Sequence, residues 1–246
     1  DLARTLCRRT APAVFGILLA VLSVTVILVH VLAGRQDRAA VESSTGLVDA
    51  MLHERTELMR RIVIDYAAWE EAYLNLHRTL SVDWAYGRHQ LSSSLDSTFG
   101  FEMVMVVRPD DTVGYAFADG TLLGGDPRPR LTGGIDALIA AARLATPPAA
   151  DETVPIVANL LLDGEPAIVG AGAVVPPAGA LVARDPGTPT VLLFVDRLSP
   201  QELVRRGDGD LVQGLRFLPP AVTSGVGISL ASFDGKPMTR LTWQVP

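Results

Sequence analysis

The stretch VDAMLHERTELMRRIVIDYAAWEEAYLNL, residues 48–76, decides the fold of this chain, because its apolar residues repeat in steps of four and three. That spacing is a heptad seam, which is typical of a helix lying along a partner. Only Arg55 breaks the polarity of the seam, whose positions are Val48, Leu52, Arg55, Met59, Ile62, Tyr66, Trp69, Tyr73 and Leu76. Because no proline interrupts residues 35–80, we expect one long helix over about that range.

The partner of this seam is either the same helix of a second subunit or the chain's own sheet. For the aromatic end of the seam both alternatives stay open. From Arg35 to about Leu58 we expect a homodimer through the long helix, since little else in the sequence is there to cover that end. Farther on, Asp65, Trp69 and Tyr73 are spaced by four and would form a ladder on one helix face.

A strongly apolar segment precedes the seam. Residues 13–33 contain no formal charge, and at ~1.5 Å per residue they span ~30 Å, the hydrocarbon thickness of a bilayer. We therefore predict a transmembrane helix over residues 13–33. A cleaved signal peptide is the alternative, but the apolar run is longer than the hydrophobic region of a usual signal sequence.

Basic residues set the orientation of this segment. Three arginines lie within residues 1–12 and favour the cytoplasmic side. The sequence thus predicts a cytoplasmic flank over 1–12, a single N-terminal anchor in a bacterial inner membrane, and a periplasmic or extracellular domain over 34–246. Within that domain the long helix spans about 35–80 and an α+β body about 81–246.

Charge and cysteine content exclude two classes of protein. The chain carries a formal net charge of −6, and because residues 1–34 carry +2, the part beyond them carries −8. Such an acidic surface argues against nucleic acid as a partner. The only cysteine, Cys7, lies in the inner flank, so the outer part forms no intrachain disulfide.

Past residue 80 the pattern changes to short apolar runs separated by turn residues. It predicts strands over 101–107, 113–117 and 191–196, hairpins around Asp163-Gly164 and Asp234-Gly235, and helices within 84–95, over 133–145 and from Ser199 onward. Hairpin connections favour an antiparallel sheet. The predicted fold class is therefore α+β, with a long N-terminal helix packed on an antiparallel sheet built of hairpins and preceded by one transmembrane helix.

No group of residues requires catalysis. Glu70 and Glu71 would lie about 100° apart around a helix, which fits a solvent-exposed face better than an acid/base pair. His53, His77 and His89 are too scattered for a helical metal site, and no CxxC, HExxH, Walker or GxSxG motif occurs. We expect no enzyme activity, no metal and no cofactor in this chain.

A binding site has more support in the sequence. The candidate ligand-binding residues are Asp65, Trp69, Tyr73, Trp84 and Tyr115. Aromatic faces beside a carboxylate can hold an amine or another cation, at about 0.5–2 kcal/mol per contact. The alternative is that Trp69 and Tyr73 form the core end of the seam, and for Tyr115, on a hairpin strand, core and pocket stay equally open.

The segment DYAAWEEAY, residues 65–73, resembles the motif of the class-four CHASE domain, the cyclase/histidine-kinase-associated sensory extracellular family. Glu70 and Glu71 stand where the family has acids, and five further residues match its motif: Asp65, Tyr66, Ala67, Trp69 and Tyr73. The turn RPDDT, residues 108–112, departs from the family's Asp-Pro-Asp-Gly form at its first and last positions. A weaker resemblance covers the rest of residues 35–246.

The resemblance implies a periplasmic sensor of the PAS-like kind, flanked by two membrane helices and controlling a cytoplasmic output such as a diguanylate cyclase or a phosphodiesterase. We thus expect a second membrane helix after Pro246 and a small-molecule or protein ligand. Ligand capture at the aromatic end would move the uninterrupted helix as a piston or by rotation. Two rivals are a membrane-anchored scaffold that binds another protein and, third, a secreted hydrolase with a cleaved leader.

Overall fold

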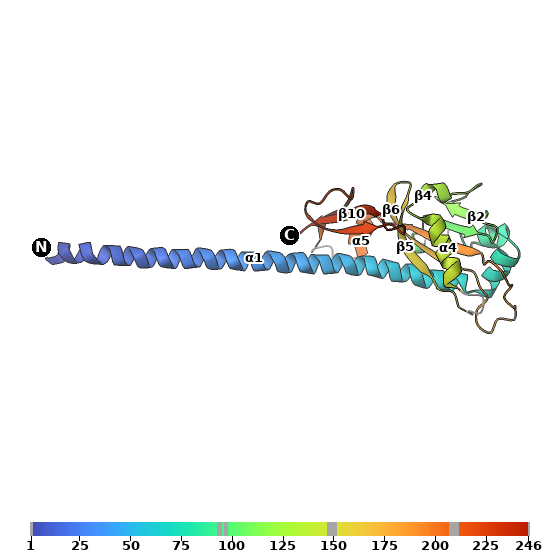
Figure 1. Ribbon diagram of the computed structural model, residues 1–246, viewed down its shortest axis with the longest axis horizontal. Coiled ribbons are helices and arrows are strands. Elements are labelled where there is room, and N and C mark those ends of the chain that lie inside the picture. Colours follow the sequence, from blue (N-terminus) through green and yellow to red (C-terminus); the bar gives the residue numbers. More distant parts are fainter. Residues whose placement is uncertain (1, 93–94, 96–97, 147–151, 207–211, 246) are drawn as a thin grey trace.

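One helix, α1 (Leu2–Ala67), is much the longest element and extends far beyond the body of the molecule toward the N-terminus (Figure 1). The computed structural model describes residues 2–92, 95, 98–146, 152–206 and 212–245. On the protruding part of α1 these apolar side chains are 47–64% exposed: Leu19, Leu22, Val24, Val26, Ile27, Leu28, Val29, Val31 and Leu32. Judged on the described residues, none of the helices combines the length and the apolar character that a membrane crossing needs.

The long helix ends at Ala67, so the prediction of one helix over 35–80 is wrong in its C-terminal part. The carbonyl of Ala67 accepts a hydrogen bond from the backbone N–H of Val175 at 3.0 Å. Trp69 then takes an extended backbone, with φ −123° and ψ 129°. The helical hydrogen bonding therefore stops where the sheet region supplies a competing donor.

Short helical pieces follow this break. They are α2 (Glu70–Ala72) and two π-helical turns, η1 (Tyr73–Arg78) and η2 (Asp83–Gly87). The expected ladder is broken, because Asp65 is exposed on α1 whereas Tyr73 is buried on the far side of the break. The helix expected within 84–95 is realised in part by η2, and residues 93–94 of that prediction lie outside the described residues.

The body is built on an antiparallel sheet with the strand order β3-β2-β1-β7-β6-β5-β4. Its strands are β1 (Met103–Val107), β2 (Val113–Ala118), β3 (Thr121–Leu122), β4 (Leu131–Thr132), β5 (Ile156–Leu162), β6 (Glu165–Ala173) and β7 (Val191–Arg197). A short 3₁₀ turn, η3 (Arg128–Arg130), leads into β4. The hairpin predicted around Asp163-Gly164 is confirmed, since both residues have positive φ and connect the paired strands β5 and β6.

Helices cover both faces of this sheet, α1 on one side and α4 (Ile135–Ala145) on the other. Successive side chains of a strand point to opposite faces, so the central strands feed two cores. In β7, Leu192 and Phe194 belong to the α1 core, whereas Leu193 and Val195 belong to the α4 core. Burial on both faces explains why this strand is apolar at nearly every position.

A second, three-stranded sheet lies beside α1, nearer the N-terminus than the first sheet (Figure 1). It follows α5 (Pro200–Arg206) and has the order β8-β10-β9, with β8 (Gln213–Leu218), β9 (Val226–Ala231) and β10 (Pro237–Gln244). The hairpin predicted around Asp234-Gly235 is confirmed as the β9–β10 connection. Strand β8 was not predicted, because QGLRFL has no clean alternation of apolar and polar residues.

The seam of α1 faces the chain's own domain. Val48 and Met51 share a core with Leu241 and Trp243 of the second sheet, while farther along α1 packs on the first sheet. The expectation that residues 35–58 have little to cover them is therefore wrong from Ser44 onward, where the second sheet covers α1. Over the first sheet the approach is close: a Cβ added to Gly170 in β6 would lie 2.6 Å from Cγ of Met59.

Candidate functional site

A buried ion pair joins α1 to the end of β7. Asp196 follows Leu192 and Phe194 on the face of β7 that looks toward α1, so the alternation of the strand directs its carboxylate at Arg55. Nε of Arg55 donates to Oδ2 of Asp196, and Nη2 donates to Oδ1 at 2.7 Å and to the carbonyl of Phe99 at 3.2 Å. The two side chains are only 9% and 2% exposed, so this bidentate pair is shielded from solvent.

Two opposing effects act on the Arg55 guanidinium. Burial by itself lowers its pKa, but the hydrogen bonds and the negative charge of Asp196 more than offset that effect, and the pKa lies above its ordinary value. Nη1 of Arg55 is buried and has no hydrogen-bond partner among the described residues. One edge of the guanidinium is thus hydrogen-bonded to Asp196, while Nη1 on the other side has no hydrogen-bond partner among the described residues.

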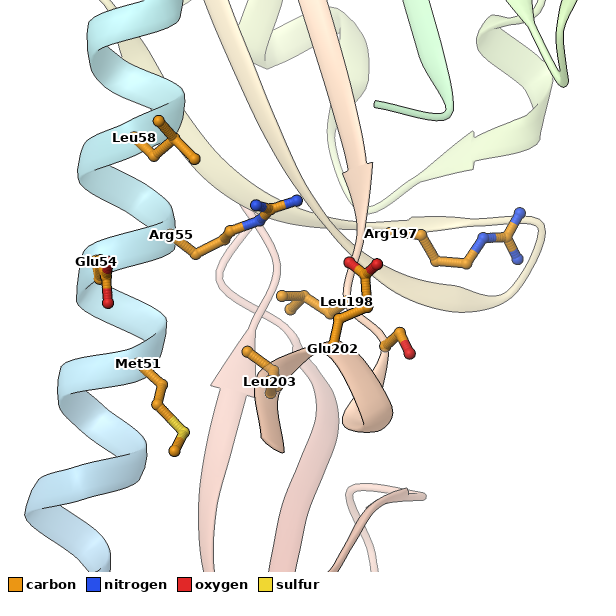
Figure 2. A pocket seen from close by; sticks show the side chains of 9 residues that line it. Met51, Glu54, Arg55, Leu58, Arg197, Leu198, Glu202 and Leu203 are labelled. Carbon is orange, nitrogen blue, oxygen red and sulfur yellow. The ribbon is translucent and has the colours of Figure 1, made fainter. Parts of the chain in front are cut away.

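A small cavity adjoins the ion pair where α1, the end of β7 and α5 meet (Figure 2). It has a volume of about 50 Å³. Its apolar wall is formed by Met51 and Leu58 of α1 with Leu198 and Leu203, and its polar wall by Glu54, Arg55, Arg197, Ser199 and Glu202. Because a water molecule needs ~10–15 Å³ of such volume, the cavity has room for only a few waters or one small chemical group.

Arg197, the residue after Asp196, connects the end of β7 to Glu102 and Glu165. Its Nε donates to Oε1 of Glu102 at 3.1 Å, its backbone N–H donates to Oε2 of Glu102 at 2.7 Å, and its Nη1 pairs with Glu165 at the start of β6. Burial raises the pKa of Glu102, and its bonds to Arg197 oppose that rise. The end of β7 is therefore held by acidic residues at the ends of both neighbouring strands, β1 and β6.

A larger groove opens on the other side of Arg197 and has a volume of about 710 Å³. One wall comes from the first sheet and the start of α5, and the other from β8 and β10 of the second sheet. Both cavities share Arg197, Leu198 and Ser199, so the connection from β7 to α5 lies between them. We call this region, with its ion pair, cavity and groove, the junction.

The five residues predicted from the sequence to bind a ligand lie elsewhere, near the break after α1. Trp69 is half-buried and its ring lies 5.2 Å from that of the buried Trp84, whose Nε1 donates to Glu71 at 3.4 Å. Asp65 is exposed on the last turns of α1. The structure thus brings two of the five, Trp69 and Trp84, into direct contact, and it places an acid beside them that is not Asp65.

The two tyrosines of that set are buried and hydrogen-bonded. Tyr115 donates to the carbonyl of Leu91 at 2.6 Å, and burial raises its pKa. The hydroxyl of Tyr73 accepts the backbone N–H of Asp185 at 2.6 Å. Both side chains belong to the α1 core, and the cavities at the junction are lined by other residues.

His77 continues this buried polar cluster. Its ring stacks on Tyr73, and its Nδ1 accepts the backbone N–H of Thr190 at 3.3 Å. Burial lowers the pKa of His77, against a raising effect from Asp185, whose carboxylate lies 3.9 Å from Nε2. Arg78 holds the same carboxylate with two hydrogen bonds, so the loop before β7 is tied to η1 by charge.

The junction was missed by the sequence reasoning, although one signal pointed to it. Arg55 was the single charged residue in an otherwise apolar seam, and a charge at such a position needs a buried partner. Asp196 ends the apolar run of β7 in the same way. Among the described residues, no group of three or more histidines, cysteines or acids is placed to hold a metal ion.

Comparison with known proteins adds one match. The model of the CHASE4 domain family matches residues 51–212, which is well over half of the chain. The match begins within α1, four residues before Arg55, includes the whole first sheet and α5, and ends just before β8. A search of curated proteins found none that matches the chain.

Proposed function

Because the chain belongs to the CHASE4 domain family, a family of sensory domains, we propose that it is the extracytoplasmic ligand-sensing part of a transmembrane signalling receptor. In this proposal the chain is not itself an enzyme and controls a cytoplasmic output module, such as a diguanylate cyclase or a phosphodiesterase. The sheet order β2-β1-β7-β6-β5 supports the PAS-like interpretation. In this order the β1–β2 hairpin pairs with β7, the last strand of the first sheet along the chain, within a single antiparallel sheet.

The observation that carries the proposal is the course of α1. The helix runs unbroken from Leu2 to Ala67, so its exposed apolar part and the part that packs on both sheets form one element. A rigid helix passes a displacement at one end to the other. A change of packing at the junction would therefore reach the apolar segment.

Membrane anchoring through residues 13–33 remains part of the proposal. Its support is the uncharged run in the sequence and the exposure of the apolar side chains described between Leu19 and Leu32. An aqueous protein rarely leaves such a continuous apolar surface uncovered. The three arginines before the run favour an N-terminus in the cytoplasm of a bacterium and a periplasmic domain.

We also propose a homodimer and an aromatic ligand site. A homodimer through α1 would use the helix before Ser44 or the outer face of α1, because the seam from Ser44 to Ala67 is occupied by the chain's own sheets. The aromatic site of Asp65, Trp69, Tyr73, Trp84 and Tyr115 would need the contact between Trp69 and Trp84 to open for an amine. Loss of amine binding in Trp69→Ala with binding kept in Tyr86→Ala would support that site.

The placement of the domain is tested by fusing reporters after Pro246. Alkaline phosphatase, which works only outside the cytoplasm, should be active, and green fluorescent protein exported unfolded should be dark. The N-terminus of the purified protein should be intact, which separates an anchor from a cleaved leader. A reporter active solely in the cytoplasm would refute the placement.

Signal transfer is tested with Ala39→Pro, an exposed position between the apolar run and the first buried contact at Ser44. In a receptor whose output is a diguanylate cyclase, the proline should remove the response to ligand while leaving ligand binding unchanged, because it breaks α1 outside the body. Ala39→Gln keeps the helix and is the matched control. A normal response in the proline variant would contradict transfer through α1.

A further inference from the structure

The groove of the junction lies between a part of the chain that the family model matches and a part that it does not match. Its first wall, from Leu161 to Gln201, falls within the residues matched by the family model, and its second wall, on β8 and β10, falls outside them. We propose that this groove binds a small amphipathic monocarboxylate, a molecule with one carboxylate on an apolar body. The proposal names the ligand class of the sensor and rests on that proposed function.

The size of the groove fits a small organic molecule. Its volume of about 710 Å³ falls in the range of roughly 300–1,000 Å³ that is usual for small-molecule sites. The neighbouring cavity of about 50 Å³ is too small for such a ligand. Of the two cavities at the junction, only the groove can therefore hold a metabolite-sized molecule.

The walls of the groove are mainly apolar. Leu161 and Leu198 line it on the side of the first sheet, and Phe217, Leu218 and Met238 line it on the side of the second. Phe217 and Leu218 are half-buried, so apolar surface remains open to the groove. Burying an apolar body there removes surface from water at about 25 cal/mol per Å².

One charge in the groove is available to an anion. The charged residues of its lining are Glu165, Arg197 and Arg216. Arg197 is already neutralised by Glu102 and Glu165. Arg216 is exposed and forms no ion pair within the described part of the chain, so it is the charge left for a carboxylate.

Occupancy of the groove would act on α1 through two routes. The wall at Leu198 continues into the small cavity and the Arg55–Asp196 pair. The other wall belongs to the sheet whose β9 contacts α1. A ligand that changes the distance between the walls therefore changes how α1 is held between them.

The proposal is tested by isothermal titration calorimetry on the full chain in nanodiscs of neutral lipid. The probes are phenylacetate, its neutral amide phenylacetamide, the cation phenethylamine, and acetate, which has no apolar body. Phenylacetate should bind up to about fivefold more tightly than phenylacetamide, since an ion pair with an exposed side chain is worth up to about 1 kcal/mol. In Trp69→Ala, which removes the aromatic site proposed for amines, phenethylamine and acetate should each bind more weakly than phenylacetamide.

Two variants locate the binding. Arg216→Gln should weaken the binding of phenylacetate by up to about fivefold and leave that of phenylacetamide unchanged, because the amide has no charge for the guanidinium to pair with. Arg61→Gln, an exposed arginine of α1, is the matched control and should change neither. Leu218→Trp fills the groove while Arg216 is kept, and it should weaken the binding of both probes, with circular dichroism confirming that each variant is folded.

Three results would overturn the proposal: no heat with phenylacetate at millimolar concentration, equal affinities for phenylacetate and its amide, or unchanged binding in both Arg216→Gln and Leu218→Trp. Binding is measured here without any signalling output. A failure of the ligand class is therefore distinguished from a failure of the sensor function, which the reporter fusions and Ala39→Pro test separately.

Discussion

Replacing Asp196 by alanine should destabilise the fold by about 3 kcal/mol. The exchange removes one partner of an ion pair whose side chains are 9% and 2% exposed, and breaking such a pair costs about 3–5 kcal/mol because a charge stays buried without compensation. The lower end of that range applies because Arg55 keeps its bond to the carbonyl of Phe99. For a chain of this length the loss corresponds to a fall of about 6–12 °C in melting temperature.

The assay is urea unfolding of the full chain in detergent micelles, followed by tryptophan fluorescence, since Trp69, Trp84 and Trp243 all lie in the body. The double variant Arg55→Met with Asp196→Leu removes both charges and should recover most of the loss, to within about 1 kcal/mol of the parent. Glu57→Gln breaks the half-exposed pair with Arg60 on the same helix and should cost less than about 0.5 kcal/mol.

Two outcomes would refute this reasoning about the ion pair. One is a cost below about 1 kcal/mol for Asp196→Ala, which would mean that the carboxylate is not buried against α1. The other is a double variant as unstable as the single one, which would place the loss in packing and not in the unpaired guanidinium.

The remaining predictions concern packing and pH. Gly170→Ala should destabilise the chain by about 1–3 kcal/mol, because the new Cβ would lie 2.6–2.7 Å from side-chain atoms of α1, and Val63→Ala in the same chain should recover part of the loss. Gly46→Ala, with open space around its Cβ, should stabilise α1 by about 0.5–1 kcal/mol, so thermal melts of the two variants should shift in opposite directions. In the folded chain the pKa of His77 is lowered below its ordinary value of 6.5. Below about pH 6.5 the unfolded chain therefore takes up the proton first. The free energy of unfolding then falls as the pH decreases, by at most about 1.4 kcal/mol per pH unit. Urea unfolding between pH 7.5 and 5 should show this loss in the parent and in His53→Gln but a shallower one in His77→Gln, and parallel curves for all three would contradict it.

Local signals were enough to predict the hairpins and the fold class. Asp163-Gly164 and Asp234-Gly235 are turns whose backbone conformation is favoured by the two residues alone. Both connect the strands that were expected to form hairpins there. The long helix was likewise visible in its 3.5-residue period. These features depend on neighbours in the sequence, which is why one sequence suffices for them.

The end of α1 and the junction depend on contacts between distant parts of the chain. Nothing in DYAAWEEAY stops a helix, and the break falls where Val175, over 100 residues away in the sequence, donates to the carbonyl of Ala67. Arg55 indicated a buried charge from its place in the seam. Its partner, Asp196, is 141 residues away and is identified only by the register of β7. The aromatic residues had the right types for a pocket, and their burial depends on the sheet packed around them.

In the proposed sensor, the geometry of α1 favours tilting over sliding as the way a change at the junction would be transmitted. Close packing of Met59 on Gly170 and the bond from Val175 to the end of the helix resist displacement along the helix axis. If the helix pivots at Ala67, Arg55 lies ~18 Å from the pivot and Ala33 ~51 Å, at ~1.5 Å per residue. A sideways shift of α1 at Arg55 is then enlarged about threefold where the apolar segment ends. In the proposed sensor, small changes in the ion pair and the walls beside it would therefore be sufficient to move that segment.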